Sequence, residues 1–427
     1  MSLDPEFEAE LFGRHRGAIE PGLEKIEALL KALGNPELTF PSVHIAGTNG
    51  KGTVAHTVAG ILYAHGLRVG LFTSPHLQRL NERFVVNGVE VPDHILKGLF
   101  EEVVGVADDL EAEGGMTITF FEISTAVAFL YFSRSQVDLA VVETGLGGRL
   151  DSTNVLSPLV SVITSVAMDH ETYLGTTISA IATEKAGIIK PDTPVVIGEL
   201  LEEARSVCLD IAASRGAPFI DIRDTTQVTQ PRSRGSLSVE TGQTSYRGIQ
   251  IEKFGSPQQS NLAVSLISSE LVLERLGVAV DPARSVAAVS ALQIPGRFER
   301  ISENPEMRCD VAHNPAAFVA LRDAVLEVYG DRSVHVVIGM CVDKGLAACM
   351  ATVEEFAESV EVVPIQDKRS ANPELLAEHI SGEVRINSTL RAALESARIR
   401  ADKDNGLVLV CGSVFLVGEL RELLEMS

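Results

Sequence analysis

The segment from Val43 to Thr53 limits the possible folds of this chain more than any other. It reads Val-His-Ile-Ala-Gly-Thr-Asn-Gly-Lys-Gly-Thr, so an apolar, β-prone run enters a loop that contains three glycines and one lysine. The pattern that follows predicts an amphipathic helix from about Thr53 to His65. A strand, a glycine-rich loop and a helix N-terminus together favour phosphate binding, because the loop N–H groups and the helix dipole point at one place.

Two side chains of this segment are of the types that bind a nucleoside triphosphate and its metal ion. Lys51 is expected to reach the β- and γ-phosphates, and the Thr53 hydroxyl is expected to bind Mg²⁺. The spacing departs from the common P-loop, since no glycine stands five residues before Gly50 and Gly52 separates the lysine from the threonine. The alternative is a glycine-rich turn that binds nothing.

Strand-like and helix-like segments alternate along the chain, which predicts parallel α/β sheets covered on both faces. A length of 427 residues exceeds one ordinary core, so two or three domains are expected. A second α/β pattern begins near Gln293–Phe298. We predict an N-terminal, P-loop ATPase-like domain with a mostly parallel sheet over residues 1–295, and a smaller Rossmann-like α/β domain over residues 296–427.

Apolar periodicity locates the main elements of both domains. Helices are expected at residues 22–33, 94–113, 122–133, 179–186 and 257–277, and strands at 69–73, 139–143, 160–166, 195–198, 308–312, 335–340, 360–364 and 407–411. Residues 81–88 and 237–251 resemble hairpins. The first residues, Met1–Glu10, are expected to be poorly ordered.

Composition argues against several classes of partner and location. The chain has 36 Lys and Arg against 58 Asp and Glu, a net charge of −22, which disfavours nucleic acid and anionic membranes. We find no apolar run of ~18–20 residues and no basic stretch followed by an apolar core at the N-terminus. The five cysteines include no Cys-x-x-Cys, which suits thiols in a reducing compartment. We therefore expect a cytoplasmic protein, a monomer, with small-molecule partners.

Polar groups stand at the ends of several predicted strands. Besides the glycine loop, they are Thr73-Ser74-Pro75-His76, Glu143, and Asp169-His170. Ligands of an open parallel sheet collect beyond the C-terminal ends of its strands, so these groups are expected to surround one phosphate site. Glu143 and Ser74 offer the oxygen ligands that suit Mg²⁺. His170 fits either a metal ligand or a structural residue.

Three further groups have both a functional and a plain interpretation. The segment from Gly145 to Asp151, Gly-Leu-Gly-Gly-Arg-Leu-Asp, is either a second loop approached by an anionic substrate or a tight turn. Arg297, at the domain boundary, and Asp310, after a strand, could clamp a nucleotide across two domains. Taken singly, each is equally a surface ion-pair residue, worth little.

Together these motifs resemble the folylpolyglutamate synthase and dihydrofolate synthase family of the Mur ligase superfamily, whose members form amide bonds at the expense of ATP. The resemblance covers almost the whole chain, in the order of the motifs and in their number. They are Gly47–Thr53, Thr73–Leu77, Asn81–Arg83, Phe120–Glu122, Glu143–Asn154, Asp169-His170, Glu184–Ile188, Pro295–Phe298, Asp310–Pro315 and Cys411–Ser413. This chain departs from the family at Thr144, often valine, and at Asp343-Lys344-Gly345, often Asp-Lys-Asp.

The resemblance implies roles where the motifs match. Catalytic roles fall on Lys51, Lys185, His170 and Asp151; ATP contacts on Thr48, Asn49, Gly50, Lys51, Gly52, Thr53, Asn261, Arg297 and Asp310; and Mg²⁺ ligands on Ser74, Glu143 and His170. Substrate contacts fall on Ala18, Ile19, Glu20, Thr119, Phe120, Phe121, Glu122, Leu150, Asp151 and Ser152. Lys185 matches a lysine that the family carries as a carbamate.

The resemblance also implies the reaction: L-glutamate is added to dihydropteroate, to a folate, or to both, through an acyl phosphate, with ATP and Mg²⁺. Segments Ala18–Leu23 and Thr119–Glu122 resemble the bifunctional members, so we favour both activities over folylpolyglutamate synthase activity alone. Two alternatives stay open. A P-loop ATPase or GTPase switch would explain the glycine loop but not the second domain. A peptidoglycan Mur ligase normally has a further N-terminal domain, and only about forty residues precede the loop here.

Overall fold

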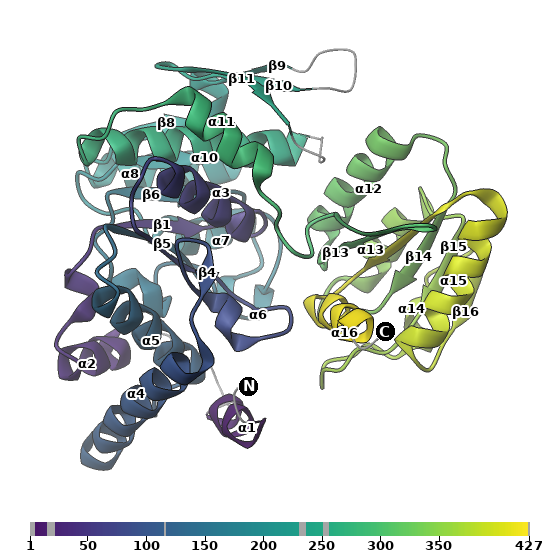
Figure 1. Cartoon of the computed structure of the whole chain (residues 1–427), viewed down its shortest axis with the longest axis horizontal. Coiled ribbons are helices and arrows are strands. Elements are labelled where there is room, and N and C mark those ends of the chain that lie inside the picture. Colours follow the sequence, from purple (N-terminus) through teal and green to yellow (C-terminus); the bar gives the residue numbers. More distant parts are fainter. Residues whose placement is uncertain (1–4, 15–21, 115–116, 230–235, 251–255, 426–427) are drawn as a thin grey trace. The chain divides into compact units, whose positions relative to one another are not determined.

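The computed structural model describes residues 5–14, 22–114, 117–229, 236–250 and 256–425. The chain divides into two compact units, Met1–Ile251 with Gln259–Leu292, and Glu252–Gln258 with Gln293–Ser427, called here the first and the second unit. Each unit has its own sheet with helices packed against it (Figure 1). The predicted mixed α/β class with parallel-rich sheets is confirmed.

An eight-stranded sheet with the order β4-β3-β2-β5-β1-β6-β7-β8 organises the first unit. Strands β2, β5, β1, β6, β7 and β8 are parallel, whereas β3 and β4 form an antiparallel edge. The bounds are β1 Ser42–Ala46, β2 Val69–Phe72, β3 Phe84–Val86, β4 Val89–Glu90, β5 Leu139–Glu143, β6 Val160–Ile163, β7 Val195–Ile197 and β8 Phe219–Asp221. The central strands are continuous buried runs, as a parallel sheet covered on both faces requires.

Successive residues of each central strand enter different cores. Phe72 and Val142 face a core with α2, α4 and α5, while Leu71 and Val141 face a core with α3 and α10. A third core forms where α7 and α8 pack beside β6 and β7. The bounds are α2 Glu24–Ala32, α3 Lys51–Ala64, α4 Asp93–Gly114, α5 Phe120–Arg134, α7 Ile178–Ala186, α8 Glu202–Ser214 and α10 Ser256–Arg275.

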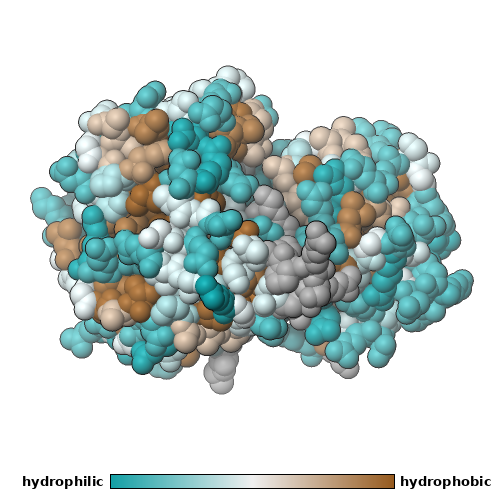
Figure 2. All heavy atoms as spheres, turned by 90° about the horizontal axis from the view of Figure 1, so that it is seen from above, coloured by the Kyte–Doolittle hydropathy of each residue, from teal (hydrophilic) through white to brown (hydrophobic). Residues whose placement is uncertain are grey.

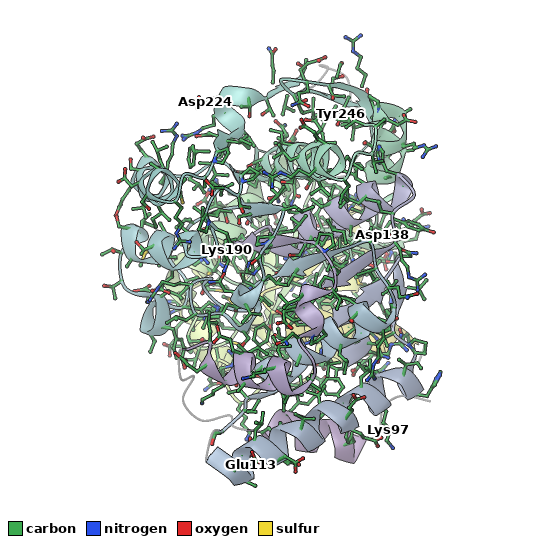
Figure 3. The ribbon with its side chains drawn as sticks, turned by 90° about the vertical axis from the view of Figure 1, so that its left-hand side faces the viewer. Lys97, Glu113, Asp138, Lys190, Asp224 and Tyr246 are labelled. Carbon is green, nitrogen blue, oxygen red and sulfur yellow. The ribbon has the colours of Figure 1, made fainter. Side chains whose placement is uncertain are left out.

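Smaller elements complete the first unit. They are α1 Pro5–Gly13, α6 Glu171–Leu174, α9 Ile222–Thr225, α11 Pro282–Ala291, the 3₁₀ turns η1 Pro36–Leu38, η2 Leu80–Arg83 and η3 Ser152–Val155, and an antiparallel sheet of β9 Gln227–Thr229, β10 Leu237–Glu240 and β11 Ser245–Ile249. Figure 3 shows Lys97 and Glu113 of α4 at one end of this unit and Tyr246 of β11 at the other.

The second unit is built on a six-stranded sheet with the order β12-β13-β17-β14-β15-β16. Only the β12–β13 pair is antiparallel. The strands are β12 Glu299–Glu303, β13 Glu306–Asp310, β14 Val334–Ile338, β15 Ser359–Val362, β16 Val384–Ile386 and β17 Leu407–Cys411. The helices are α12 Pro315–Tyr329, α13 Leu346–Glu354, α14 Pro373–Ala377, α15 Leu390–Asp404 and α16 Val414–Glu425. The side chains of α12 and α13 pack with β14 and β17 in one core.

One sequence expectation is wrong. Met1–Glu10 were expected to be poorly ordered, but from Pro5 onward these residues belong to α1, whose Leu11 is buried in the core of α2, α4 and α5. Met1–Asp4 lie outside the described residues. A short amphipathic segment gains its stability from such packing rather than from its own helix propensity. In the part of the chain that the structure describes, no helix is long and apolar enough to cross a membrane. On the face shown in Figure 2, hydrophobic residues occur in small groups among hydrophilic ones.

Candidate active site

The glycine loop joins β1 to α3, as the sequence predicts. Gly50 caps α3 with a φ of 87°, a left-handed conformation that favours glycine. A Cβ at this position would also overlap the amide of Asn261, which lies in the second turn of α10. The loop therefore needs a glycine at position 50 for its conformation and for its approach to Asn261.

Replacing Gly50 by alanine is expected to weaken nucleotide binding by about tenfold or more and to lower the Tm. A left-handed non-glycine residue costs ~1–2 kcal/mol, and the overlap with Asn261 adds to that cost. Gly105→Ala is the matched control, because Gly105 lies inside α4 with open space around its Cβ position and should gain stability. Calorimetric titration with an ATP analogue checks the prediction, and an unchanged affinity in Gly50→Ala would contradict it.

Thr48 and Asn49 tie the loop to the segment after β6. The Thr48 N–H donates to Ser165 O at 2.8 Å, its hydroxyl donates to Ala167 O at 3.1 Å, and the Asn49 N–H donates to Ser165 Oγ at 2.9 Å. In return, Ser165 Oγ donates to Asn49 O at 2.8 Å. The Thr48 hydroxyl thus fixes the loop in this structure. Gly52 and Thr53 lie in the first turn of α3, behind Gly50.

Lys51, Glu143 and Ser74 come together at the C-terminal ends of three adjacent strands. Lys51 Nζ donates to Gly47 O at 3.0 Å and lies 3.9 Å from Glu143 Oε1. The other oxygen, Glu143 Oε2, accepts from the Ser74 N–H at 3.3 Å. Glu143 is only 4% exposed, so its negative charge is held beside the lysine in a poorly solvated place.

The third predicted metal ligand, His170, lies in the segment after β6. His170 has a φ of 50° and caps α6, and its Nε2 is 3.9 Å from Asp169 Oδ2. No group of three or more His, Cys, Asp or Glu side chains that could hold a metal occurs among the described residues. A few scattered oxygen donors suit Mg²⁺, which keeps several waters and binds through one or two carboxylates and phosphate oxygens. The oxygen donors of Ser74 and Glu143, which the Ser74 N–H hydrogen bond joins, are of the type that suits Mg²⁺.

Lys185, near the end of α7, is the most unusual cation of this unit. It is only 3% exposed. Burial, and next to it the charge of Lys51, lower the pKa of Lys185 to about 7, while Asp169 and Asp151 oppose that shift. A lysine in such surroundings holds a neutral amine in a large fraction of molecules near neutral pH. Its electrostatic neighbours come from the glycine loop, the segment after β6 and the turn before η3, so all three segments converge on Lys185.

The segment Gly145–Asp151 forms a tight loop against the end of α7. The Arg149 N–H donates to Glu184 O at 2.7 Å, and the Arg149 and Glu184 side chains form an ion pair at 2.8 Å. Gly147 has a φ of 69°. Asp151 is buried and its Oδ2 accepts from the Leu146 N–H at 2.7 Å, while burial raises the pKa of its carboxyl. Both interpretations of this segment, a tight turn and a substrate loop, are compatible with this geometry.

The predicted substrate residues fall in two places. Thr119 and Glu122 form a reciprocal cap at the start of α5, where the Thr119 N–H donates to Glu122 Oε2 at 2.6 Å. Phe121 lies against Gly145, so α5 contacts the Gly145–Asp151 loop. Leu150 and Ser152 flank Asp151. Ala18, Ile19 and Glu20 lie outside the described residues.

Arg83, to which the sequence motifs assign no role, lies between His76 and Phe120, the first residue of α5. Arg83 Nε donates to His76 Nδ1 at 2.9 Å, and the Arg83 guanidinium lies 5.4 Å from the centre of the Phe120 ring. Burial lowers the pKa of His76 to about 3, so this ring is a neutral acceptor. Both residues belong to motifs seen in the sequence, Thr73–Leu77 and Asn81–Arg83. Their pairing depends on the β2–β3 hairpin, which local patterns do not specify.

Arg297 and Asp310 lie in the second unit, at its beginning. Asp310 ends β13, and its carboxylate accepts from the Phe298 N–H at 2.7 Å and the Ala312 N–H at 2.8 Å. Arg297 is half-buried, directly before Phe298. Asp310 thus fixes the turn that carries Arg297.

Comparison with known families defines the class of the protein. Residues 45–268 match the Mur ligase middle domain, and residues 296–414 match the Mur ligase glutamate ligase domain. The two-unit α/β fold with a glycine loop before α3 is therefore that of a Mur ligase.

Individual relatives narrow the class further. The chain is 32% identical to the dihydrofolate synthase/folylpolyglutamate synthase of Bacillus subtilis, over 97% of each chain. It resembles the structure of Mycobacterium tuberculosis folylpolyglutamate synthase complexed with ADP and AMPPCP with a TM-score of 0.91, at 32% identity, over 98% of this chain and 97% of that one. Escherichia coli FolC in complex with DHPP and ADP has a TM-score of 0.89, at 30% identity, with 99% and 97% covered. The chain belongs to the folylpolyglutamate synthase and dihydrofolate synthase family.

Proposed function

We propose that this protein is an ATP-dependent ligase that adds L-glutamate to the carboxyl group of a pteroate or folate. The observation that carries the proposal is the position of Lys51 Nζ, 3.9 Å from Glu143 Oε1 at the mouth of the β1–α3 loop. This pair provides one cation for phosphate oxygens and one carboxylate for a metal. Relatives matched over nearly their full length support the same reaction.

The chain's own residues would contribute in a defined order. The N–H groups of the β1–α3 loop and Lys51 hold the phosphates of ATP, and the acceptor carboxylate attacks the γ-phosphorus in line. The P–O bond to ADP breaks as the new bond forms, giving an acyl phosphate. The amine of glutamate then attacks the acyl carbon, loses a proton and displaces phosphate. Lys51 lies where negative charge builds up, so it lowers the barrier of the first step.

Ser74, Glu143 and His170 are the residues that would hold Mg²⁺. Bound there, the ion would neutralise charge on the phosphate oxygens. Ser74 and Glu143 are already joined by the 3.3 Å hydrogen bond from the Ser74 N–H. We also assign a catalytic role to Asp151, because its buried carboxylate lies among the segments that surround Lys185.

Lys185 is proposed to carry a carbamate. A neutral amine adds to CO₂, forming an N–C bond and releasing one proton, and a pKa of about 7 makes the neutral amine available. The product replaces a positive charge by a negative one and offers oxygens to Mg²⁺ or to its waters. Burial at 3% exposure protects the modification from bulk water.

The proposal extends to the second unit and to the setting of the enzyme. Asn261, Arg297 and Asp310 are included as further ATP contacts, and the functional boundary of the chain is placed between residues 295 and 296. The five cysteines are buried thiols and form no disulfide, which supports a reducing cytoplasm. The net charge of −22 supports small-molecule partners rather than nucleic acid or an anionic membrane. We include a monomeric state in the proposal.

Both acceptors are expected to be substrates. Phosphate release with ATP and glutamate should be stimulated by dihydropteroate and also by tetrahydrofolate. The motivation is the cap of α5 by Thr119 and Glu122, with Phe120 beside Arg83, in a segment that resembles the bifunctional members. Turnover of tetrahydrofolate alone would remove the dihydrofolate synthase activity and leave the folylpolyglutamate synthase activity.

A further inference from the structure

A buried chain of three polar residues runs behind the Gly145–Asp151 loop. His44 Nε2 lies 2.8 Å from Thr153 Oγ1, and the Thr153 hydroxyl donates to Asp151 Oδ1. The Thr153 N–H donates to the same oxygen at 3.1 Å. His44 and Thr153 are fully buried and Asp151 is 5% exposed. This series of hydrogen bonds therefore leads from the interior of β1 to the carboxylate at the start of η3.

The protons of this chain have one preferred order. Asp151 accepts N–H groups at both oxygens, so it acts as an acceptor and the Thr153 hydroxyl points its hydrogen toward it. His44 must then donate through Nε2–H. Its Nδ1 is buried without a hydrogen-bond partner among the described residues, and an orphan lone pair costs less than an orphan N–H. Burial also lowers the pKa of His44 to about 3, which keeps the ring neutral.

The series of hydrogen bonds ends at the His44 ring. A proton arriving at Asp151 could not leave through Nδ1 of His44, since that atom meets no partner in the described part of the protein. At the other end of this series, Asp151 binds backbone groups of the Gly145–Asp151 loop. Its Oδ2 accepts from the Leu146 N–H at 2.7 Å, and its N–H donates to Gly148 O at 3.2 Å. A Cβ at Gly148 would lie 2.9 Å from Lys185 O, so the loop touches the end of α7.

We infer that His44 and Thr153 are positioning residues, which hold the Asp151 carboxylate so that the Gly145–Asp151 loop keeps a single conformation against Lys185. His44 fixes the direction of the Thr153 hydroxyl, the hydroxyl fixes Asp151, and Asp151 fixes the Leu146 N–H. The catalytic part of this inference rests on the proposed ligase function. The structural part, the order of the loop, does not.

The test uses variants that remove or restore the donors. Thr153→Val and His44→Phe remove one donor each, and Thr153→Ser and His44→Gln keep one. Thr352→Val is the matched control, because that buried hydroxyl donates only to Ala348 O within α13. The double variant Thr153→Val/His44→Phe reports whether the two residues act through one chain. Each protein is measured for hydrogen exchange of the Leu146 amide, for kcat/KM of the acceptor, and for Tm.

The expected results are specific to a positioning role. Thr153→Val and His44→Phe should speed exchange at Leu146 and lower kcat/KM by roughly tenfold, as for loss of a hydrogen bond to a charged group. The double variant should be no worse than the poorer single variant, and the serine and glutamine variants should approach the unaltered enzyme. Thr352→Val should change neither quantity, whatever its Tm.

Three outcomes distinguish failure of the positioning role, failure of its effect on catalysis, and failure of the proposed ligase function. Unchanged Leu146 exchange in folded Thr153→Val and His44→Phe would overturn the positioning of the loop. Faster exchange with an unchanged kcat/KM would overturn its role in catalysis. If the unaltered enzyme shows no glutamate-dependent turnover while the exchange pattern appears as expected, the proposed function fails and the positioning chain is supported as a structural device.

Discussion

Replacing Lys51 by alanine is expected to lower kcat by about 10²–10³-fold, because it removes a preorganised cation from the place where negative charge develops on the transferred phosphoryl group. Lys51 Nζ is held by Gly47 O at 3.0 Å and faces Glu143 at 3.9 Å, so its position is fixed before the substrate binds. The side chain contributes little packing, and the Tm should change by only a few degrees. Steady-state phosphate release gives kcat, and circular dichroism confirms the fold.

The control for this variant is Lys97→Ala. Lys97 lies on α4, where it forms an exposed pair with Glu101, and Figure 3 shows it at one end of the first unit. Its removal should leave kcat unchanged. Near-normal turnover in Lys51→Ala, with Lys97→Ala also normal, would show that the β1–α3 loop is not the catalytic nucleotide site.

Replacing Lys185 by alanine is expected to lower kcat by on the order of 10–100-fold, and short carboxylic acids added to the assay should restore part of the loss. The magnitude is typical of a group that supports a metal without being its main ligand. The added acid would supply the carboxylate oxygens that the carbamate provides in the unaltered enzyme. Restored activity that saturates with acetate or formate, and that Lys51→Ala lacks, would separate this role from general activation.

The pH dependence of Lys185 has a defined sign. Its pKa of about 7 lies below the ordinary value of 10.5, so the neutral amine that reacts with CO₂ increases as pH rises through 7. An enzyme stripped of CO₂ should therefore regain activity with bicarbonate at pH 8 and much less at pH 6. Native mass spectra at pH 8 should show the added mass of CO₂. A fully active enzyme–ATP–Mg²⁺ complex with a well-ordered, unmodified Lys185 amine would contradict the carbamate.

The sequence predicts best the elements whose local pattern is unambiguous. Strands β5 and β17 have the predicted bounds, since each is a continuous apolar run that a central parallel strand requires. Edge elements such as β8 and β16 were not predicted, because they are short and partly exposed and owe their pairing to a neighbouring strand. The order of α1 was missed for a similar reason, because its stability comes from distant packing.

The candidate site shows the same division. The glycine loop and the strand-end residues Glu143 and Ser74 could be located from sequence because strand ends of a parallel sheet meet at one edge. Contacts between segments that are distant in the sequence could not be predicted in this way. The Thr48 hydroxyl meets Ala167, 119 positions away, and His44 meets Thr153, 109 positions away. These partners depend on the register of β1 beside β6 and on the path of the loop after β5, which no local pattern encodes.

The central claim is that the acceptor carboxylate is activated by ATP and then joined to glutamate. Its most direct test supplies dihydropteroate labelled with ¹⁸O in the carboxyl group, together with ATP, Mg²⁺ and glutamate, and measures both products by mass spectrometry. Attack of the carboxylate on the γ-phosphorus predicts an amide product heavier by one glutamyl residue and one ¹⁸O atom in each released phosphate. Release of unlabelled phosphate together with the amide product would contradict the claim.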